Sequence, residues 1–201
     1  MILGGSISEL LRRDLIMQAL ILASESPRRR ELLTQAGFEF TVEVAHAQEI
    51  SEGRPEDVTV QNAVLKAQAV QKHQPGRMVL GADTVVYVDG RVFGKPKDEQ
   101  DAKRMLEALN GRWHQVYTGV AMTDPEGGLH TAYAVTDVHF VDMTEEEIIS
   151  YIATGEPFGK AGSYAIQSRA GYFVDRIEGS FSNVIGLPLT TVRELLKEIT
   201  G

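Results

Sequence analysis

The segment MVLGADTVVYV, Met78–Val88, is strongly apolar and carries a single acid, Asp83. An apolar run of this kind, rich in β-branched residues, predicts a strand buried on both faces. Asp89-Gly90 follows and predicts a hairpin turn into Arg91–Phe93. Because a carboxylate is costly to bury without a charged partner or a metal, Asp83 is our first candidate for catalysis or metal binding. The alternative is a structural ion pair with a lysine.

Around this strand, helices and strands alternate irregularly. Apolar runs predict further strands at Ala19–Ala23, Phe38–Val44, Trp113–Thr123 and Leu129–Val141. Helical spacing and capping residues predict helices at Pro27–Ala36, Pro55–Lys72, Asp98 to near Gly111, Thr144–Ala153 and Leu189–Ile199. The segment that follows a glycine-rich stretch, 155–162, is expected to be mostly strand. We therefore predict an α/β fold with a mixed sheet flanked by helices.

Composition narrows the class of protein. The chain has 201 residues, which fits one compact domain; we place it at 18–201 and assign no function to an N-terminal extension, 1–17. It has no cysteine, so disulfides and Cys-based metal sites are excluded. A net charge of −8 argues against a nucleic-acid binder. Without a bilayer-length apolar run or a signal peptide, we expect a cytoplasmic protein with no membrane partner.

A second candidate site is Ser24–Arg30, SESPRRR. A strand that turns sharply into a helix presents free backbone N–H groups at the helix start, where anions bind. Two hydroxyls and three guanidinium groups would strengthen such a site, because Arg pairs bidentately with phosphate oxygens. The alternative is a helix cap, Ser26 with Pro27 at the first helical position, followed by a solvated basic turn.

Two lysines beside glycines form a third candidate, in Gly94-Lys95-Pro96-Lys97 and Gly159-Lys160-Ala161-Gly162. Neither has the spacing of a Walker A phosphate loop. Together they place a cation on flexible backbone at two points, as a triphosphate pocket requires. The five histidines show no metal-ligand spacing, and no serine-hydrolase elbow is present.

In order along the chain, seven segments resemble the Maf family of nucleotide pyrophosphatases, also described as septum-formation inhibitors. The resemblance extends from Leu20 to about Leu195. The segments are Leu22–Arg29, Asn62–Ala67, Gly81–Val86, Gly94–Pro96, His114–Val120, Lys160–Gln167 and Ile177–Pro188.

This resemblance implies a curved sheet with two lobes around a central nucleotide-binding cleft, as in inosine triphosphatases. It implies hydrolysis of dTTP and UTP to the monophosphate and pyrophosphate, with Mg²⁺ or Mn²⁺ and a homodimeric protein. Asp83 would be the catalytic carboxylate and, with Glu49, a metal ligand. The residues implied to bind phosphates are Ser24, Arg28, Arg29, Lys66, Lys95 and Lys160. Thr84 and Gln167 would set base choice, since a Gln amide offers a donor and an acceptor to a pyrimidine edge.

One departure from the family pattern and two alternative functions stay open at this point. The segment Val44–Glu49 has one acid where the family often has more, which implies weaker metal binding or a changed metal preference. The base recognised could be a different one, such as that of 7-methyl-GTP. The protein could also be a nucleotide-binding regulator of septum formation with little turnover.

Overall fold

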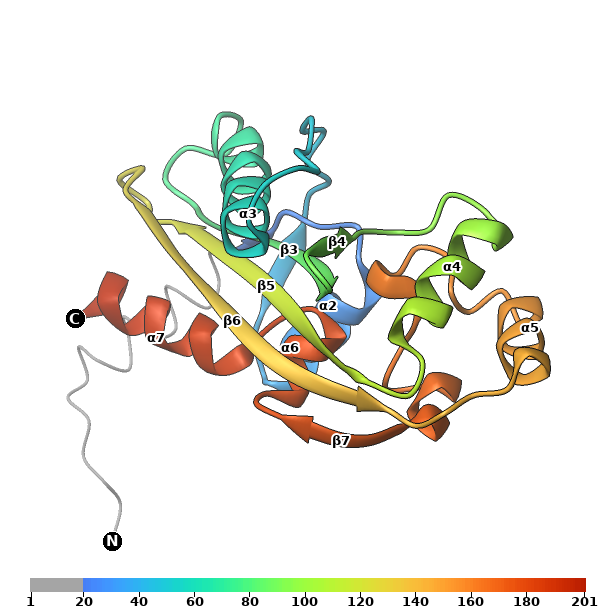
Figure 1. Ribbon diagram of the computed structural model, residues 1–201. Helices are drawn as coiled ribbons and strands as arrows, with labels where there is room; N and C mark the ends of the chain where they lie inside the picture. The colour runs from blue at the N-terminus through green and yellow to red at the C-terminus, as the bar shows by residue number, and fades with distance from the viewer. Residues whose placement is uncertain (1–19) are drawn as a thin grey trace, which may run out of the picture.

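The computed structural model describes residues 20–201, and the predicted extension 1–17 lies outside them. The chain forms a seven-stranded mixed sheet flanked by helices, which confirms the predicted fold class (Figure 1). The strands are β1 Leu20–Leu22, β2 Phe40–Val42, β3 Met78–Val88, β4 Arg91–Phe93, β5 Trp113–Thr123, β6 Leu129–Phe140 and β7 Val174–Glu178. The helices are α2 Pro27–Gln35, α3 Pro55–Gln71, α4 Glu99–Leu109, α5 Glu145–Ala153, α6 Phe181–Ile185 and α7 Leu189–Thr200, with 3-10 turns η1 Ala161–Ser163 and η2 Arg169–Phe173.

The sheet is parallel at one edge and antiparallel elsewhere. Strand order is β2-β1-β3-β5-β6-β7, with β1 parallel to both β2 and β3. β5 lies antiparallel to β3 along nearly all of its length and pairs Gly119 with Asp83. The opposite edge of β3 is shared: β1 pairs with Met78–Leu80, and β4 pairs with Val86–Val88. Within the described chain no strand pairs with positions 81–85 on that edge, so a gap opens there.

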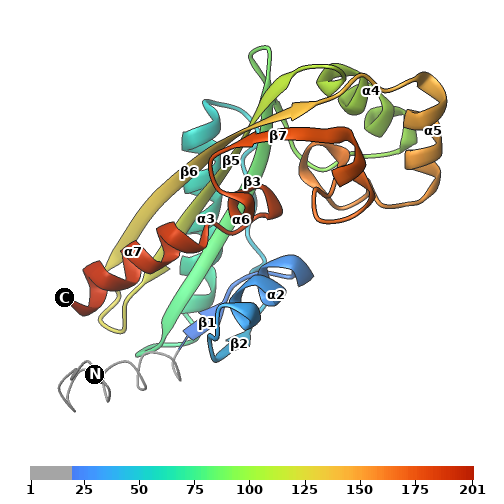
Figure 2. The same ribbon diagram turned by 90° about the horizontal axis from the view of Figure 1, so that it is seen from below.

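Helices cover the two faces of the long strands differently. α3 packs on one face, where Val79 and Ala121 meet Ala63 and Ala67. α2 and α7 contribute to the apolar cluster on the other face, which includes Leu80. α4 and α5 lie at the far end of the strands from the C-terminus of α7, and they enclose a third cluster (Figures 1 and 2). Since successive strand residues face opposite sides, Asp83 points toward α3 and its neighbour Thr84 points away from it.

Two glycines let α3 approach the sheet closely. A Cβ added at Gly81 would overlap the carbonyl oxygen of Ala63, and one at Gly119 would overlap the carbonyl group of Thr59. Neither glycine has a positive φ, so the requirement is one of space. The close approach brings side chains from α3 within reach of Asp83.

Several local predictions are confirmed. β3 and the β4 hairpin have the predicted bounds, and Ser26, Asp98 and Thr144 cap the helices that follow them. The expectation of mostly strand after the glycine-rich stretch is wrong, because within residues 163–188 only β7 is a strand. Gly162 and Ser163 have φ of 67° and 65°, which turns the backbone out of an extended path.

The subdivision into two lobes and the single domain at 18–201 stay predictions. No helix within residues 20–201 is both long and apolar enough to cross a bilayer.

Candidate active site

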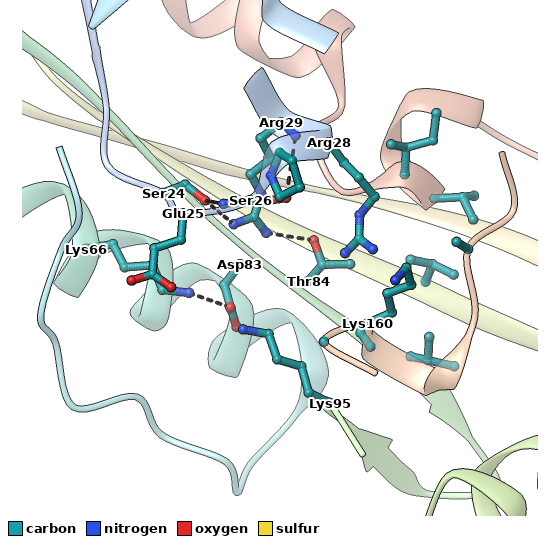
Figure 3. Close-up of a pocket in the computed structure, with 18 of the residues that line it drawn as sticks. Ser24, Glu25, Ser26, Arg28, Arg29, Lys66, Asp83, Thr84, Lys95 and Lys160 are labelled. Carbon is teal, nitrogen blue, oxygen red and sulfur yellow. Dashed lines mark hydrogen bonds and ion pairs between the residues drawn. The ribbon is translucent and has the colours of Figure 1, made fainter. Parts of the chain in front are cut away.

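A cavity of about 460 Å³ opens at the gap in the edge of β3. All ten residues that the sequence picked out line this one cavity, although they come from six separate segments. They are Ser24, Arg28, Arg29, Glu49, Lys66, Asp83, Thr84, Lys95, Lys160 and Gln167. Figure 3 labels eight of them, all but Glu49 and Gln167. The gap lets side chains from both faces of β3 reach the same space.

Asp83 lies at the cavity wall and is only 9% exposed. One carboxylate oxygen accepts a hydrogen bond from the Lys66 ammonium at 2.6 Å, and the other accepts from the Asn62 amide at 3.0 Å. Lys66 also contacts the Glu49 carboxylate at 3.0 Å. A lysine and an amide on α3 therefore satisfy the buried acid, and Lys66 faces carboxylates where the sequence predicted phosphates.

Arg29 is held by neutral acceptors on three sides. Its guanidinium donates to Ser24 Oγ at 3.0 Å, to Thr84 Oγ1 at 3.1 Å and to the Gly186 carbonyl at 2.8 Å. Burial lowers the pKa of Arg29, while the charge of Asp83 opposes that shift. Arg29 thus fixes the positions of Ser24 and Thr84 and keeps its positive charge beside the cavity.

Three further cations in the cavity have no carboxylate partner. Within residues 20–201, the side chains of Arg28 and Lys95 make no hydrogen bond or ion pair, and Lys160 Nζ donates only to the Phe158 carbonyl at 3.3 Å. Burial lowers the pKa values of Arg28 and Lys160, and in Lys160 repulsion from Arg28 adds to this. Figure 3 shows the three side chains entering the cavity from different segments. Such unpaired, converging cations are suited to an anion with several charged oxygens.

Side-chain hydroxyls satisfy two of the backbone N–H groups at the start of α2. Ser24 Oγ accepts from the backbone N–H of Ser26 at 3.2 Å, and Ser26 Oγ accepts from that of Arg29 at 3.5 Å. The two hydroxyls turn onto the local backbone, so the side chains of Arg28 and Arg29 supply most of the positive character here.

The sequence of this chain is similar to those of known proteins. The family model described as "Maf-like protein" matches residues 19–199. The chain belongs to the Maf-like family. A protein of Geotalea uraniireducens named dTTP/UTP pyrophosphatase is 50% identical over 190 residues, covering 92% of this chain and 98% of its own. A Geobacillus protein of the same name is 50% identical over 182 residues, covering 89% and 97%.

Solved structures show the same fold at low identity. The Ham1 proteins of Staphylococcus aureus and Coxiella burnetii are 14% and 17% identical to this Maf-like protein, and each has a TM-score of 0.51. Each comparison covers 89% of this chain and 98% of the other. At such identities the likeness concerns the fold alone.

Two carboxylates, Glu49 and Asp83, form the acidic wall of the Maf-like site and are the residues that would hold a divalent cation. Glu49 and Asp83 both contact one cation, the Lys66 ammonium, and Glu49 is about half exposed. No group of three His, Cys, Asp or Glu residues within the described chain is arranged to hold a metal. Mg²⁺ is commonly bound by one or two carboxylates together with substrate phosphates, so the two carboxylates fit such an ion.

The sequence pointed to Asn62 only as part of a motif and gave it no role. Its amide oxygen accepts from the Ile50 N–H at 2.8 Å, and its NH₂ donates to the Ile50 carbonyl at 2.9 Å as well as to Asp83. Asn62 thereby joins Asp83 to the segment that carries Glu49. The available signal was its spacing of four residues from Lys66, which places both on one helix face.

Proposed function

We propose that this protein is a nucleoside triphosphate pyrophosphatase that hydrolyses dTTP and UTP to the monophosphate and pyrophosphate. The observation that carries the proposal is the division of one cavity into an acidic wall, Asp83 and Glu49, and a wall of three unpaired cations. The names of the two 50% identical relatives support the substrate class.

The three unpaired cations suit the leaving group. Arg28, Lys95 and Lys160 line the cavity without carboxylate partners, so their charge is available to the β- and γ-phosphates. Negative charge grows on the departing pyrophosphate as the bond to the α-phosphorus breaks, and fixed cations stabilise it without reorganising. Arg29 keeps Ser24 and Thr84 in place beside them.

Asp83 suits the attacking water. Its carboxylate accepts the proton of a water molecule whose oxygen forms a bond to the α-phosphorus, while the α–β bridging oxygen leaves with the bonding electrons. Lys66 and Asn62 fix the orientation of that carboxylate. Asp83 and Glu49 would also hold Mg²⁺ or Mn²⁺, which when bound supplies further neutralisation of phosphate charge.

Base choice is assigned to Gln167 and Thr84. Both line the cavity, and Thr84 is held by Arg29 and by Thr118, 3.0 Å from its hydroxyl. Gln167 is exposed, and within residues 20–201 its amide makes no hydrogen bond, so it can pair with a pyrimidine edge. A site that hydrogen-bonds its base can reject other bases strongly.

The test is product analysis with dTTP, UTP and 7-methyl-GTP, with and without Mg²⁺. Monophosphate and pyrophosphate from dTTP and UTP, formed only with the metal, support the proposal. Nucleoside diphosphate and phosphate as products would contradict cleavage between the α- and β-phosphates. A preference for 7-methyl-GTP would contradict the proposed choice of base. Binding of nucleotide without any product would favour a regulatory protein.

We also propose that the protein acts in the cytoplasm as a homodimer, on the strength of the family resemblance. Light scattering coupled to size-exclusion chromatography measures the mass in solution, and a monomer at micromolar concentration contradicts the second part.

A further inference from the structure

The segment that carries Gln167 is hydrogen-bonded to residues at the end of α5 and in the turn after it. Gln167 occupies a tight turn in which the Ser168 N–H donates to the Ala165 carbonyl at 3.0 Å. Because the Gln167 side chain has no hydrogen-bond partner within the described chain, its position depends on the backbone on either side. That backbone is bonded to two side chains, Tyr151 and Glu156.

The Glu156 carboxylate accepts four hydrogen bonds. Three come from the residues directly after Gln167: the Ser168 hydroxyl at 2.6 Å, the Arg169 N–H at 3.4 Å and the Ala170 N–H at 3.3 Å. The fourth comes from the Tyr151 hydroxyl at 2.8 Å. The same hydroxyl accepts from the Ala165 N–H at 3.3 Å. Tyr151 and Glu156 therefore hold the backbone on both sides of Gln167, and we call these two side chains the clamp.

Hydrogen bonds, and no direct ion pair, compensate the burial of Glu156, although its charge also acts on Lys160. Within residues 20–201 its carboxylate makes hydrogen bonds but no ion pair, and it is partly buried. Burial alone would raise the pKa of Glu156, but the bonds from Ser168, Tyr151 and the two backbone N–H groups outweigh it and lower that pKa. A carboxylate that accepts three of its four hydrogen bonds from one loop has the arrangement expected of a group that fixes the loop.

We propose that Glu156 is a positioning residue for base selection, whose carboxylate fixes the turn 165–170 so that the Gln167 amide meets the pyrimidine edge. The inference rests on the proposed function. Glu156 does not line the cavity, so it acts through Gln167 and touches neither phosphate nor base.

The test compares Glu156→Gln with the wild type on dTTP and dCTP, two pyrimidines that present exchanged donors and acceptors. Glu156→Gln keeps the size of the side chain and turns an NH₂ toward the donors of the loop. The ratio of kcat/KM for dTTP to that for dCTP should fall by about tenfold to a hundredfold, mostly through KM for dTTP. Glu146→Gln, an exposed glutamate on α5 without a hydrogen bond or ion pair in the described chain, should leave the ratio unchanged.

A merely structural role gives a different pattern. If the ratio of kcat/KM for dTTP to that for dCTP stays the same in Glu156→Gln, whether or not both values fall, the inference is overturned. In a Gln167→Ala background, Glu156→Gln should produce no further fall in the ratio, because the two residues act in series. Ser168→Ala removes one bond of the clamp and should lower the ratio less, which keeps the test valid if Glu156→Gln fails to fold.

Hydrogen exchange separates this inference from the proposed function. In Glu156→Gln the amides of Arg169 and Ala170 should exchange at least tenfold faster than in the wild type. Unchanged exchange at these amides in Glu156→Gln would overturn the inference that Glu156 fixes the turn, whatever the activity of the variant. Faster exchange in a protein that releases no pyrophosphate from dTTP would place the failure in the proposed function, and a wild type that does not distinguish dTTP from dCTP would refute base selection by Glu156.

Discussion

At the scale of single residues, the ammonium group of Lys66 lies between two carboxylates, 2.6 Å from Asp83 and 3.0 Å from Glu49. The side chains of Lys66 and Asp83 are each 12% exposed. Removing one member of such a pair leaves the other charge poorly solvated. Lys66 and Asp83 therefore act as one unit, with Asn62 as its third member.

Asp83→Asn should lower kcat for dTTP at least about a hundredfold, because the amide cannot accept a proton from water. Steady-state pyrophosphate release measures it. Asp142→Asn is the matched control, since Asp142 is exposed and makes no hydrogen bond or ion pair in the described chain. An Asp83→Asn protein that keeps more than half of wild-type kcat would refute the role of this carboxylate.

Arg28→Met should lower kcat/KM for dTTP about a hundredfold, since one fixed cation on the leaving group is lost. Arg30→Met on the same helix should stay within twofold, because Arg30 is exposed and outside the cavity lining. Initial rates over a range of dTTP concentrations test both variants. Equal losses in the two would mean that overall positive charge matters and the position of Arg28 does not.

At the scale of elements, the seating of α3 on β3 and β5 decides where the acid finds its partners. Gly81 and Gly119 leave no room for a side chain between the helix and the sheet. Asn62 and Lys66 reach Asp83 only from a helix at this distance. The two glycines thus belong to the active site through packing, although neither has a functional group.

Gly119→Ala should destabilise the protein by about 1–3 kcal/mol, because its methyl group overlaps the backbone of Thr59 and must push α3 away. Urea unfolding followed by circular dichroism measures this. Gly94→Ala should change the free energy of unfolding by less than about 0.5 kcal/mol, since a Cβ there meets nothing within 4 Å. Equal urea midpoints for Gly119→Ala and wild type would show that α3 can move away from the sheet at little cost in stability.

Elements governed by local chemistry were predictable from the sequence. The apolar run of β3, the Asp89-Gly90 hairpin and the Thr144–Glu147 capping box all depend on neighbouring residues. The region after Gly162 was not predictable as helix and 3-10 turn, because left-handed backbone at Ser163 overrides the strand-like composition. In the same way, the residues around the cavity could be picked out by pattern, but the pairing of Lys66 with Asp83 depends on tertiary packing between α3 and β3.

At the scale of the whole molecule, stability in acid depends on a buried histidine in the core next to α4 and α5. His114 is 2% exposed, lies 2.8 Å from the Tyr164 hydroxyl and packs edge-on against Phe140. Burial lowers the pKa of His114 to about 3. The folded protein thus keeps this ring neutral where an unfolded chain protonates it.

The free energy of unfolding should therefore fall as pH drops from about 6.5 toward 3, by up to roughly 1.4 kcal/mol per pH unit from this group. Above pH 6.5 the ring is neutral in both states and contributes no slope. His114→Gln should show a shallower decline between pH 6 and 4 in urea titrations. His73→Gln, at an exposed site, should keep the wild-type slope; identical slopes for His114→Gln and wild type would contradict the shift.

The interrupted edge of β3 has a consequence for how such a protein can diversify. The reactive acid stands on β3 itself. Lys95 and Gln167 instead lie outside the long strands, on segments that a hydrogen bond from the Gly162 N–H to the Gly94 carbonyl joins at 3.1 Å. Substitutions in a loop can retune which nucleotide is accepted without moving the acid. The residue that reacts and the residues that select the nucleotide therefore lie on separate segments. One fold can serve several nucleotides when the selecting segments change.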